Sequence, residues 1–342
     1  MANDSVAAVF YHDLFAAHAA KAGHEPALEF GSTTLSYREI NGRANMLARY
    51  LMSRGAGRES LVGLSVARSP AMIVSLLGIA KAGAAYVPFD PAEQSARRSG
   101  VMASGGISAL IVDHGGRPQG VPNEVELIDL ARDREVIAAQ PDSDPQVSLS
   151  ERNLAYLLYT SGSTGQPKGI AMEHGSVGRL IEWHGNARSD ALGQRTLQFC
   201  SIEFDFSFHE IFSTLCYGGT LVMASEDERL DPYALAQLIS SRQIERLFLP
   251  VSALLQWASA VDESSFPHPL RHVFTTGEQL RITPALRTIF GRTRAKLHNH
   301  YGATEFQDAA TLTLTGDPET WPDVVPVGHP LMVETSTGRR AP

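Results

Sequence analysis

An eleven-residue stretch, YTSGSTGQPKG at residues 159–169, has the composition of an anion-binding turn. Its glycines allow a ligand to approach the backbone closely, successive N–H groups and hydroxyls supply donors, and Lys168 supplies a cation. The stretch does not match the Walker A pattern, because Lys168 is followed by Gly169 and not by serine or threonine. The composition therefore predicts a polyphosphate-binding loop of another kind, with a mobile turn as the alternative.

Two further stretches place chemically capable side chains next to apolar runs. In FDFSFHEIF (204–212), Asp205 opens an aromatic-rich segment. Such an aspartate either caps a helix or, if it is buried, requires a cationic partner. In NHYGATE (299–305), a tyrosine and a glutamate follow an apolar run, and the alternative to a ligand site there is a tyrosine packed at a strand end beside a solvated glutamate.

Alternating strand and helix patterns are the elements that position these residues. Strand patterns at 61–66, 85–90 and 109–113 surround a helical pattern at 69–83, and a second alternating series extends from 154–160 to 296–301. Ser36 and Glu39 have the spacing of a capping box at the start of a helix over 36–54. The pattern predicts an α/β fold of two doubly wound sheets with flanking helices, whose ligands bind at the strand C-termini. We expect an N-terminal α/β subdomain (1–137), a connector (138–149), a second α/β subdomain that carries the sites (150–331) and a tail (332–342).

Composition excludes several classes of protein. The chain has 342 residues, 43% of them hydrophobic, with a formal net charge of -8 and a pI near 5.8, which argues against nucleic acid as a partner. The two cysteines do not form a CxxC pair, so neither a disulfide scaffold nor a zinc site is expected. The sequence shows neither a basic leader followed by an apolar run nor an apolar stretch of membrane-spanning length. We therefore expect a cytoplasmic protein with no membrane partner.

Five stretches resemble, in the same order, motifs of the AMP-forming adenylating superfamily. LAYLLYTSGSTGQPKG resembles its phosphate-loop signature, and LSYREI, IAKAGAAYVPFDP, FDFSFHEIF and NHYGATE resemble four other core motifs. The lysine-alanine-glycine wording of IAKAGAAYVPFDP is typical of adenylation domains of nonribosomal peptide synthetases. The resemblance implies ATP-dependent activation of an amino acid as aminoacyl-AMP with release of pyrophosphate, followed by transfer to the phosphopantetheine thiol of a peptidyl carrier protein. An acyl- or aryl-CoA ligase and a non-catalytic nucleotide-binding fragment are the alternatives.

The resemblance also implies a role for individual residues. Asp205 would pair with the α-ammonium group of the amino acid, which an acyl-CoA ligase does not require. Glu305 would hold Mg²⁺ and, with Thr304 and Lys168, would act in catalysis. The residues implied in nucleotide binding are Thr160, Ser161, Gly162, Ser163, Thr164, Gly165, Lys168, Gly277, Glu278, Asn299, Tyr301, Gly302 and Thr304. Those implied in amino-acid binding are Asp205, Phe206, His209, Val251 (or, with a shift of one position, Ser252), Phe274, Thr276, His300, Asp308 and Ala309.

The sequence departs from the family at two places. Ala303 stands where the family usually has proline. After VPVGHP (325–330), the family continues with a third, β-rich subdomain and a C-terminal lid, and neither pattern is present. We therefore expect a core truncated before its lid, which adenylates poorly alone and whose partners are a carrier protein and adjacent synthetase domains.

Overall fold

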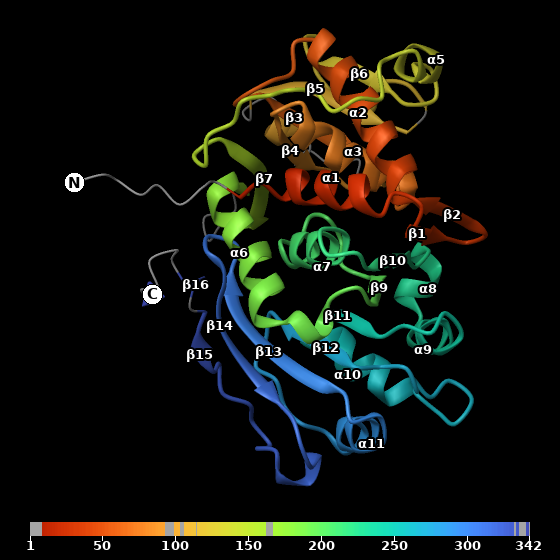
Figure 1. Ribbon diagram of the computed structural model, residues 1–342, viewed down its shortest axis with the longest axis vertical. Helices are drawn as coiled ribbons and strands as arrows, with labels where there is room; N and C mark the ends of the chain where they lie inside the picture. Colours follow the sequence, from red (N-terminus) through yellow and green to blue (C-terminus); the bar gives the residue numbers. More distant parts are fainter. Residues whose placement is uncertain are drawn as a thin grey trace. The chain divides into compact units, whose positions relative to one another are not determined.

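The computed structural model describes residues 9–92, 99–102, 106–113, 115–161, 167–331, 333–334 and 340–341 (Figure 1). The chain divides into two compact units. The six-stranded unit contains residues 8–26 and 35–178, and the nine-stranded unit contains residues 27–34 and 179 onward.

The six-stranded unit has a sheet of order β6-β5-β3-β4-β7-β8. Neighbouring strands are parallel from β6 to β7, and β8 is antiparallel to β7. Its strands are β3 (Leu61–Ser65), β4 (Ala85–Pro88), β5 (Ile107–Val112), β6 (Glu126–Asp129), β7 (Leu154–Ser161) and β8 (Pro167–Glu173). Its helices are α1 (Tyr11–Lys21), α2 (Tyr37–Ser53), α3 (Pro70–Lys81) and α5 (Arg134–Ala138), and α6 (His174–Ala187) begins here.

The start of α2 follows directly from the sequence. The Ser36 Oγ accepts a hydrogen bond from the Glu39 N–H at 3.3 Å, and the Glu39 carboxylate accepts one from the Ser36 N–H at 2.8 Å. This is the predicted capping box, and it satisfies two N–H groups that a helix start otherwise leaves without partners.

The predicted division between subdomains at residues 138–149 was wrong. That segment packs within the six-stranded unit, where Asn45 on α2 donates a hydrogen bond to the Asp142 carbonyl at 2.6 Å and Lys81 on α3 forms an ion pair with Asp144. The strand that follows, β7, pairs in parallel with β4 through Tyr86 and Tyr156. The boundary lies instead within α6, because β7 and β8 complete the first sheet and do not open the second.

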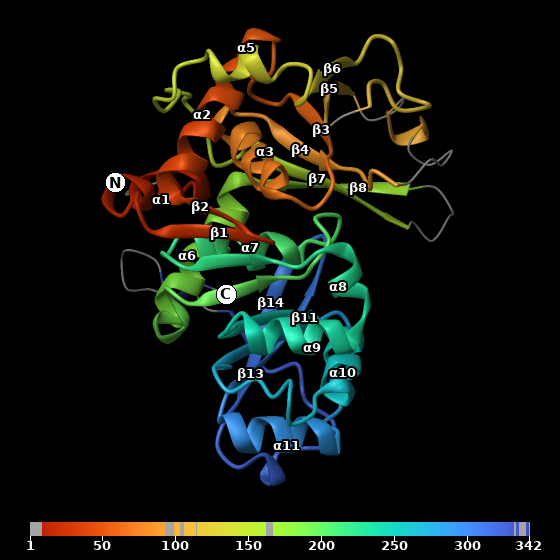
Figure 2. The same cartoon turned by 90° about the vertical axis from the view of Figure 1, so that its right-hand side faces the viewer.

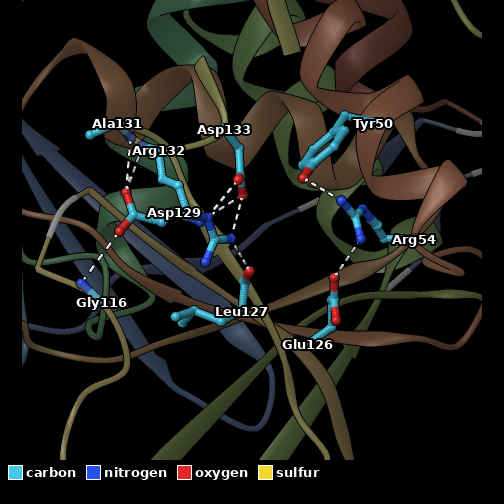
Figure 3. Close-up of polar contacts among 9 residues, drawn as sticks. All are labelled: Tyr50, Arg54, Gly116, Glu126, Leu127, Asp129, Ala131, Arg132 and Asp133. Carbon is cyan, nitrogen blue, oxygen red and sulfur yellow. Dashed lines mark hydrogen bonds and ion pairs between the residues drawn. The ribbon is translucent and has the colours of Figure 1, made fainter. Parts of the chain in front are cut away.

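A polar cluster closes the edge of the six-stranded sheet at β6 (Figure 3). The Arg132 guanidinium donates to both carboxylate oxygens of Asp133 at 2.7 Å. The Asp129 carboxylate accepts from the N–H groups of Ala131 and Arg132, and the Asp129 N–H donates to Asp133 at 3.1 Å. The turn between β6 and α5 is therefore fixed by charge-assisted hydrogen bonds.

The same figure shows α2 tied to β6 by one ion pair. Arg54, just after α2, donates to the Glu126 carboxylate at 3.1 Å and to the Tyr50 hydroxyl at 3.1 Å (Figure 3).

The nine-stranded unit has a sheet of order β15-β14-β13-β12-β11-β9-β10-β1-β2. Neighbouring strands are parallel from β13 to β1, whereas β14 is antiparallel to both β13 and β15. Its strands are β1 (Pro26–Phe30), β2 (Thr33–Ser36), β9 (Arg195–Gln198), β10 (Thr220–Met223), β11 (Arg246–Pro250), β12 (His272–Thr276), β13 (Lys296–Ala303), β14 (Gln307–Leu314) and β15 (His329–Pro330). Its helices are α7 (Phe206–Leu215), α8 (Glu226–Leu230), α9 (Pro232–Ser241), α10 (Val251–Ala260) and α11 (Pro284–Thr293); β16 (Val333–Glu334) and β17 (Arg340–Ala341) form a separate ladder.

The strand order of this sheet changes direction next to β9. The chain moves from β9 to β10 in one direction, and then returns past β9 to β11, β12 and β13 in the other. Because such crossovers are right-handed, α7 covers one face of the sheet and α9, α10 and α11 cover the other, as Figure 2 shows. A change of direction of this kind opens a crevice at the strand C-termini, where open α/β sheets bind their ligands.

The fold confirms the predicted α/β class with two sheets flanked by helices. Strands β1, β2, β8, β14 and β15 were not anticipated as sheet members. The antiparallel pairing of β8 makes the six-stranded sheet mixed, and that of β14 and β15 makes the nine-stranded sheet mixed. Both cysteines, Cys200 and Cys216, are buried, and neither forms a disulfide bond. In the ranges that the structure describes, we find no helix with the length and apolar character needed to span a membrane.

Candidate active site

The two described ends of the predicted phosphate loop lie on β7 and β8 in the six-stranded unit. Strands β7 and β8 are antiparallel, and Thr160 pairs with Lys168, one pair before the end of the ladder. Lys168 is exposed, and Thr160 is partly buried. Gly162, Ser163, Thr164 and Gly165 lie outside the described residues, as does the side chain of Ser161. The loop therefore connects two strands, in contrast to the strand-to-helix connection of a Walker A loop.

A cavity of about 590 Å³ lies in the nine-stranded unit, at the carboxyl ends of β12 and β13. It gathers most of the residues predicted for the adenosine part of a nucleotide. Tyr301 lies in its wall and is 50% exposed, so this ring is not packed at a strand end. The lining consists of Thr276, Gly277, Glu278, Gln279, Leu280, Asn299, His300, Tyr301, Gly302, Val324, Val325, Pro326 and Val327.

Local backbone chemistry explains two glycines of this cavity. Gly277 has a φ of +96°, which favours glycine. Gly302 lies at an irregularity of the β13–β14 hairpin, the long antiparallel pair at the blue end of the chain in Figure 1. A Cβ at Gly302 would lie 1.9 Å from the Gln307 carbonyl oxygen, so only glycine permits this close approach. Asn299 is fixed by a 2.9 Å hydrogen bond from its Nδ2 to the Pro326 carbonyl.

Thr304 and Glu305 form the turn of this hairpin. Thr304 is partly buried, and Glu305 is exposed and forms no ion pair with any residue that the structure describes. A free carboxylate is the kind of oxygen ligand that Mg²⁺ prefers, so Glu305 fits the metal-binding role that the resemblance implies.

Asp205 precedes α7 at the carboxyl end of β9. Although it occupies the N-cap position, its side chain makes no capping hydrogen bond, so the capping alternative does not describe it. Burial, and then the negative charge of Asp308, raise the pKa of Asp205 to about 6, against the opposing effect of backbone N–H groups. A carboxylate with a raised pKa at a strand C-terminus is suited to bind a cation, which would restore its charged form.

Asp308 on β14 brings together two predicted pocket residues. Its Oδ2 lies 2.8 Å from the His209 Nδ1 and 3.0 Å from the His300 Nδ1. The Asp308 side chain is 7% exposed, and both imidazoles are essentially buried. Burial acts to raise the pKa of Asp308, but the neighbouring His300 and His209 outweigh it and hold the pKa below its ordinary value.

Two residues that the sequence did not single out extend this group. His184 on α6 places its Nδ1 2.8 Å from the His209 Nε2, and its Nε2 lies 3.2 Å from the Arg246 Nη2. Arg246, the first residue of β11, is fully buried and donates to the Ser213 hydroxyl at 2.9 Å. The only hint in the sequence was a charged residue at the start of an apolar run, which does not reveal a partner on another element.

We call Arg246, His184, His209 and Asp308 the relay. Aromatic rings surround it: Phe248 and Phe274 stack at 4.4 Å between centroids, and the Arg246 guanidinium lies 5.3 Å and 5.5 Å from their centroids. Period-two alternation along β11, β12 and β13 places these rings and His300 on the face that α7 covers. The low polarity of this shell strengthens every charge interaction within it.

The remaining predicted pocket residues surround the same region of the nine-stranded unit. Phe206 contacts Phe248 and His300, with ring centroids 5.2 Å and 6.2 Å apart. Val251 and Thr276 are buried at the carboxyl ends of β11 and β12, and Ala309 follows Asp308 on β14 and is partly buried. His300 and Thr276 also line the 590 Å³ cavity, so the two groups of residues adjoin.

Comparison with known proteins places this geometry in a family. Residues 15–336 match the family described as AMP-binding enzyme.

The chain belongs to the AMP-binding enzyme family.

Its relatives include large synthetases, of which it matches a small part. It is 36% identical to tyrocidine synthase 2 of Brevibacillus parabrevis over 323 residues, which are 94% of this chain and 9% of that protein. It is 37% identical to malpinin synthetase of Mortierella alpina over 94% of this chain and 4% of that protein. The chain thus spans less than a tenth of the length of these two relatives.

Solved structures agree on the fold. The nonribosomal peptide synthetase FmoA3, in a form bound to α-methyl-L-serine-AMP, superposes with a TM-score of 0.85 at 21% identity, over 97% of this chain and 37% of that one. The N-terminal subdomain of Klebsiella oxytoca NpsA, in complex with anthranilyl-AMSN, superposes with a TM-score of 0.79 at 26% identity, over 95% of this chain and 83% of that one. The fold is therefore the N-terminal core that these AMP-binding proteins share.

Proposed function

We propose that the chain activates an α-amino acid: the amino-acid carboxylate attacks the α-phosphate of ATP, aminoacyl-AMP forms and pyrophosphate leaves. The observation that carries this proposal is Asp205. It is a partly buried carboxylate without a capping role, its pKa is raised to about 6, and it stands at the strand C-termini where the direction of the sheet changes. An α-ammonium group supplies the cation that such a carboxylate needs.

The cavity beside it supports nucleotide binding. Tyr301 offers an exposed ring on which adenine can stack, and the Asn299 amide adds polar atoms at the wall. In this proposal Thr304 and Glu305 act near the reacting phosphate, and Glu305 binds Mg²⁺, which would neutralise phosphate charge. The hairpin with Thr160 and Lys168 contributes to binding of the β- and γ-phosphates. The name of FmoA3 as a nonribosomal peptide synthetase, and the large synthetases of which this chain matches a small part, support transfer of the product to a carrier-protein phosphopantetheine within a multidomain enzyme. A cytoplasmic location stays a prediction.

Amino-acid-dependent exchange of labelled pyrophosphate into ATP tests the proposal. We expect exchange with a subset of α-amino acids and none with the same acids lacking the α-amine. Direct calorimetric titration with non-hydrolysable aminoacyl sulfamoyl adenosines tests binding even where turnover is slow. The Lys168→Ala variant should weaken ATP binding and leave folding intact, because its side chain is exposed.

The alternatives give different results in the same assays. Equal exchange with aryl or fatty acids lacking an amine would favour the acyl- or aryl-CoA ligase. ATP binding without exchange, and without affinity for any aminoacyl analogue, would favour a non-catalytic nucleotide-binding fragment. Either outcome would refute amino-acid activation.

A further inference from the structure

The relay has a single possible direction of hydrogen bonding. Arginine carries only donors, so the Arg246 Nη2 must donate to the His184 Nε2 at 3.2 Å. A neutral His184 then carries its proton on Nδ1 and donates it to the His209 Nε2 at 2.8 Å. His209 in turn carries its proton on Nδ1 and donates to the Asp308 Oδ2 at 2.8 Å.

The protonation states agree with this direction. Burial, helped by the charge of Arg246, lowers the pKa of His184 well below its ordinary value, and burial lowers that of His209 in spite of Asp308. Both rings are therefore neutral near pH 7. Burial also lowers the pKa of Arg246 to about 9, which leaves the guanidinium charged at neutral pH.

The same direction of hydrogen bonding argues against a metal ion bound by His209, His300 and Asp308. The ligand atoms of His209, His300 and Asp308 lie within 4.8 Å of one another, although their spacing in the sequence did not suggest it. A metal requires a lone pair on His209, but its Nε2 accepts from His184 and its Nδ1 carries the proton donated to Asp308. The cluster is organised for hydrogen bonding to a carboxylate.

Among the described residues, the groups within ion-pair distance of Asp308 are the imidazoles of His209 and His300, with no arginine or lysine beside them. Arg246 is balanced by Glu210, a fully buried carboxylate that supports its charged form. Among the described residues, Asp308 accepts hydrogen bonds only at Oδ2, so Oδ1 remains for a ligand. Its charge disfavours the ionised form of Asp205, so the two carboxylates lie within electrostatic reach of each other.

A second observation points to a ligand at this place. His300 is 3% exposed and lines the cavity; its Nδ1 lies 3.0 Å from Asp308, and its Nε2 has no hydrogen-bond partner among the described residues. A buried imidazole nitrogen without a partner is costly unless a ligand completes it.

We propose that Arg246 and His184 are positioning residues, which through His209 hold Asp308 as an ionised and oriented acceptor, so that the site selects an amino acid with a basic side chain. This inference rests on the proposed function. The α-ammonium group occupies Asp205, and the side-chain ammonium occupies Asp308. A substrate with two cationic groups thus matches two buried carboxylates, and a neutral side chain leaves one of them unbalanced.

The first experiment reads the proton positions directly in the 342-residue chain. Long-range ¹H–¹⁵N spectra of histidine-labelled protein near pH 7.5 should show His184 and His209 both as the Nδ1–H tautomer. Arg246→Met should abolish that preference, and Arg246→Lys, which keeps a donor, should retain it. An Nε2–H tautomer at either ring of the unaltered protein would overturn the positioning role, even if Arg246→Met does not fold.

The second experiment measures the choice of side chain by calorimetry. Sulfamoyl adenosine analogues of 2,4-diaminobutyrate, ornithine and lysine are compared with the size-matched analogues of norvaline, norleucine and 2-aminoheptanoate. We expect one basic analogue to bind about 10- to 100-fold more tightly than its neutral partner, and Asp308→Asn to remove most of that difference.

The outcomes separate the two proposals. A preference for the neutral analogue, or for homoserine over diaminobutyrate, would overturn this inference and leave amino-acid activation standing. A preference that Asp308→Asn leaves unchanged would also overturn it. Binding by none of the aminoacyl analogues would refute the proposed function itself, and the tautomers would still decide whether the relay orders Asp308.

Discussion

Replacing Asp205 with asparagine should stabilise the free protein and remove its affinity for an α-amino acid. The amide keeps the shape of the side chain and lacks its negative charge. In the folded chain that charge is opposed by burial and by Asp308, and the backbone N–H groups of Phe206 and Asp205 offset only part of this effect. The unaltered protein therefore retains an unfavourable charge that a bound ammonium group relieves.

The stability that Asp205→Asn should gain follows from the pKa of Asp205, which rises from 3.8 to about 6 on folding. For a carboxyl group with a raised folded pKa, the folded state binds the proton more tightly, so the penalty grows as pH rises from 3.8 to 6 and is constant above. From these two pKa values, the ionised Asp205 lowers the free energy of unfolding by about 0.5 kcal/mol at pH 4 and by about 3 kcal/mol above pH 7. Because Asp205 is partly exposed, solvent screening reduces the plateau to about 1–3 kcal/mol.

The assay is urea unfolding of the unaltered chain and of Asp205→Asn at several pH values between 5 and 8. Asp227→Asn is the matched control, since it removes an exposed carboxylate from the same unit. We expect the advantage of Asp205→Asn to increase toward pH 7 and the control to show little change. In parallel, Asp205→Asn should weaken binding of aminoacyl sulfamoyl adenosines about 10- to 100-fold.

Equal stability of Asp205→Asn and the unaltered chain at pH 8, or an advantage that does not depend on pH, would refute this reasoning. Either result would mean that Asp205 already has a compensating partner in the free protein. Retention of amino-acid affinity in the variant would refute its assignment to the ammonium group.

Three other substitutions test the cavity and the six-stranded unit. Tyr301→Ala should weaken ATP binding about tenfold by calorimetry, because it removes a stacking surface. Tyr301→Phe should retain the affinity for ATP. Unchanged ATP binding in Tyr301→Ala would exclude stacking. Gly302→Ala should destabilise the protein by about 2 kcal/mol or more in urea unfolding, because the added Cβ would lie 1.9 Å from the Gln307 carbonyl oxygen. An unchanged stability would show that the hairpin shifts freely. Asp133→Ala should lower stability by about 1–2 kcal/mol at pH 7 through loss of the Arg132 hydrogen bonds. Arg132 lowers the pKa of Asp133 below 3.8, so the stability difference between the unaltered protein and Asp133→Ala should disappear as pH falls through the ordinary and then the lowered pKa. A stability difference that persists in acid would contradict this explanation.

Local signals were sufficient to predict much of the fold and the family. The capping box of Ser36 and Glu39 depends on residues three positions apart, and the alternating apolar runs depend on period, so both can be read along the chain. Motif order pointed to the family, and the role predicted for Asp205 follows from its match to the motif of amino-acid-activating members. The division into units could not be predicted from the sequence, because β7 has the same apolar character whichever sheet it joins. Its pairing with β4 is a long-range contact that local patterns do not determine.

The sequence by itself determined which chemical groups this protein has: a glycine- and hydroxyl-rich loop with Lys168, a tyrosine beside a glutamate, and the carboxylates Asp205 and Asp308. Only the tertiary structure decided which of them share charges and protons. Arg246 and His184 are 62 positions apart, and His209 and Asp308 are 99 apart, yet hydrogen bonds join them into one relay. Periodicity and propensity act over a few residues along the chain. A buried charge is instead stabilised by the polar and charged groups that folding brings within about 4 Å of it. Which groups come that close is set by the packing of helices on the sheet.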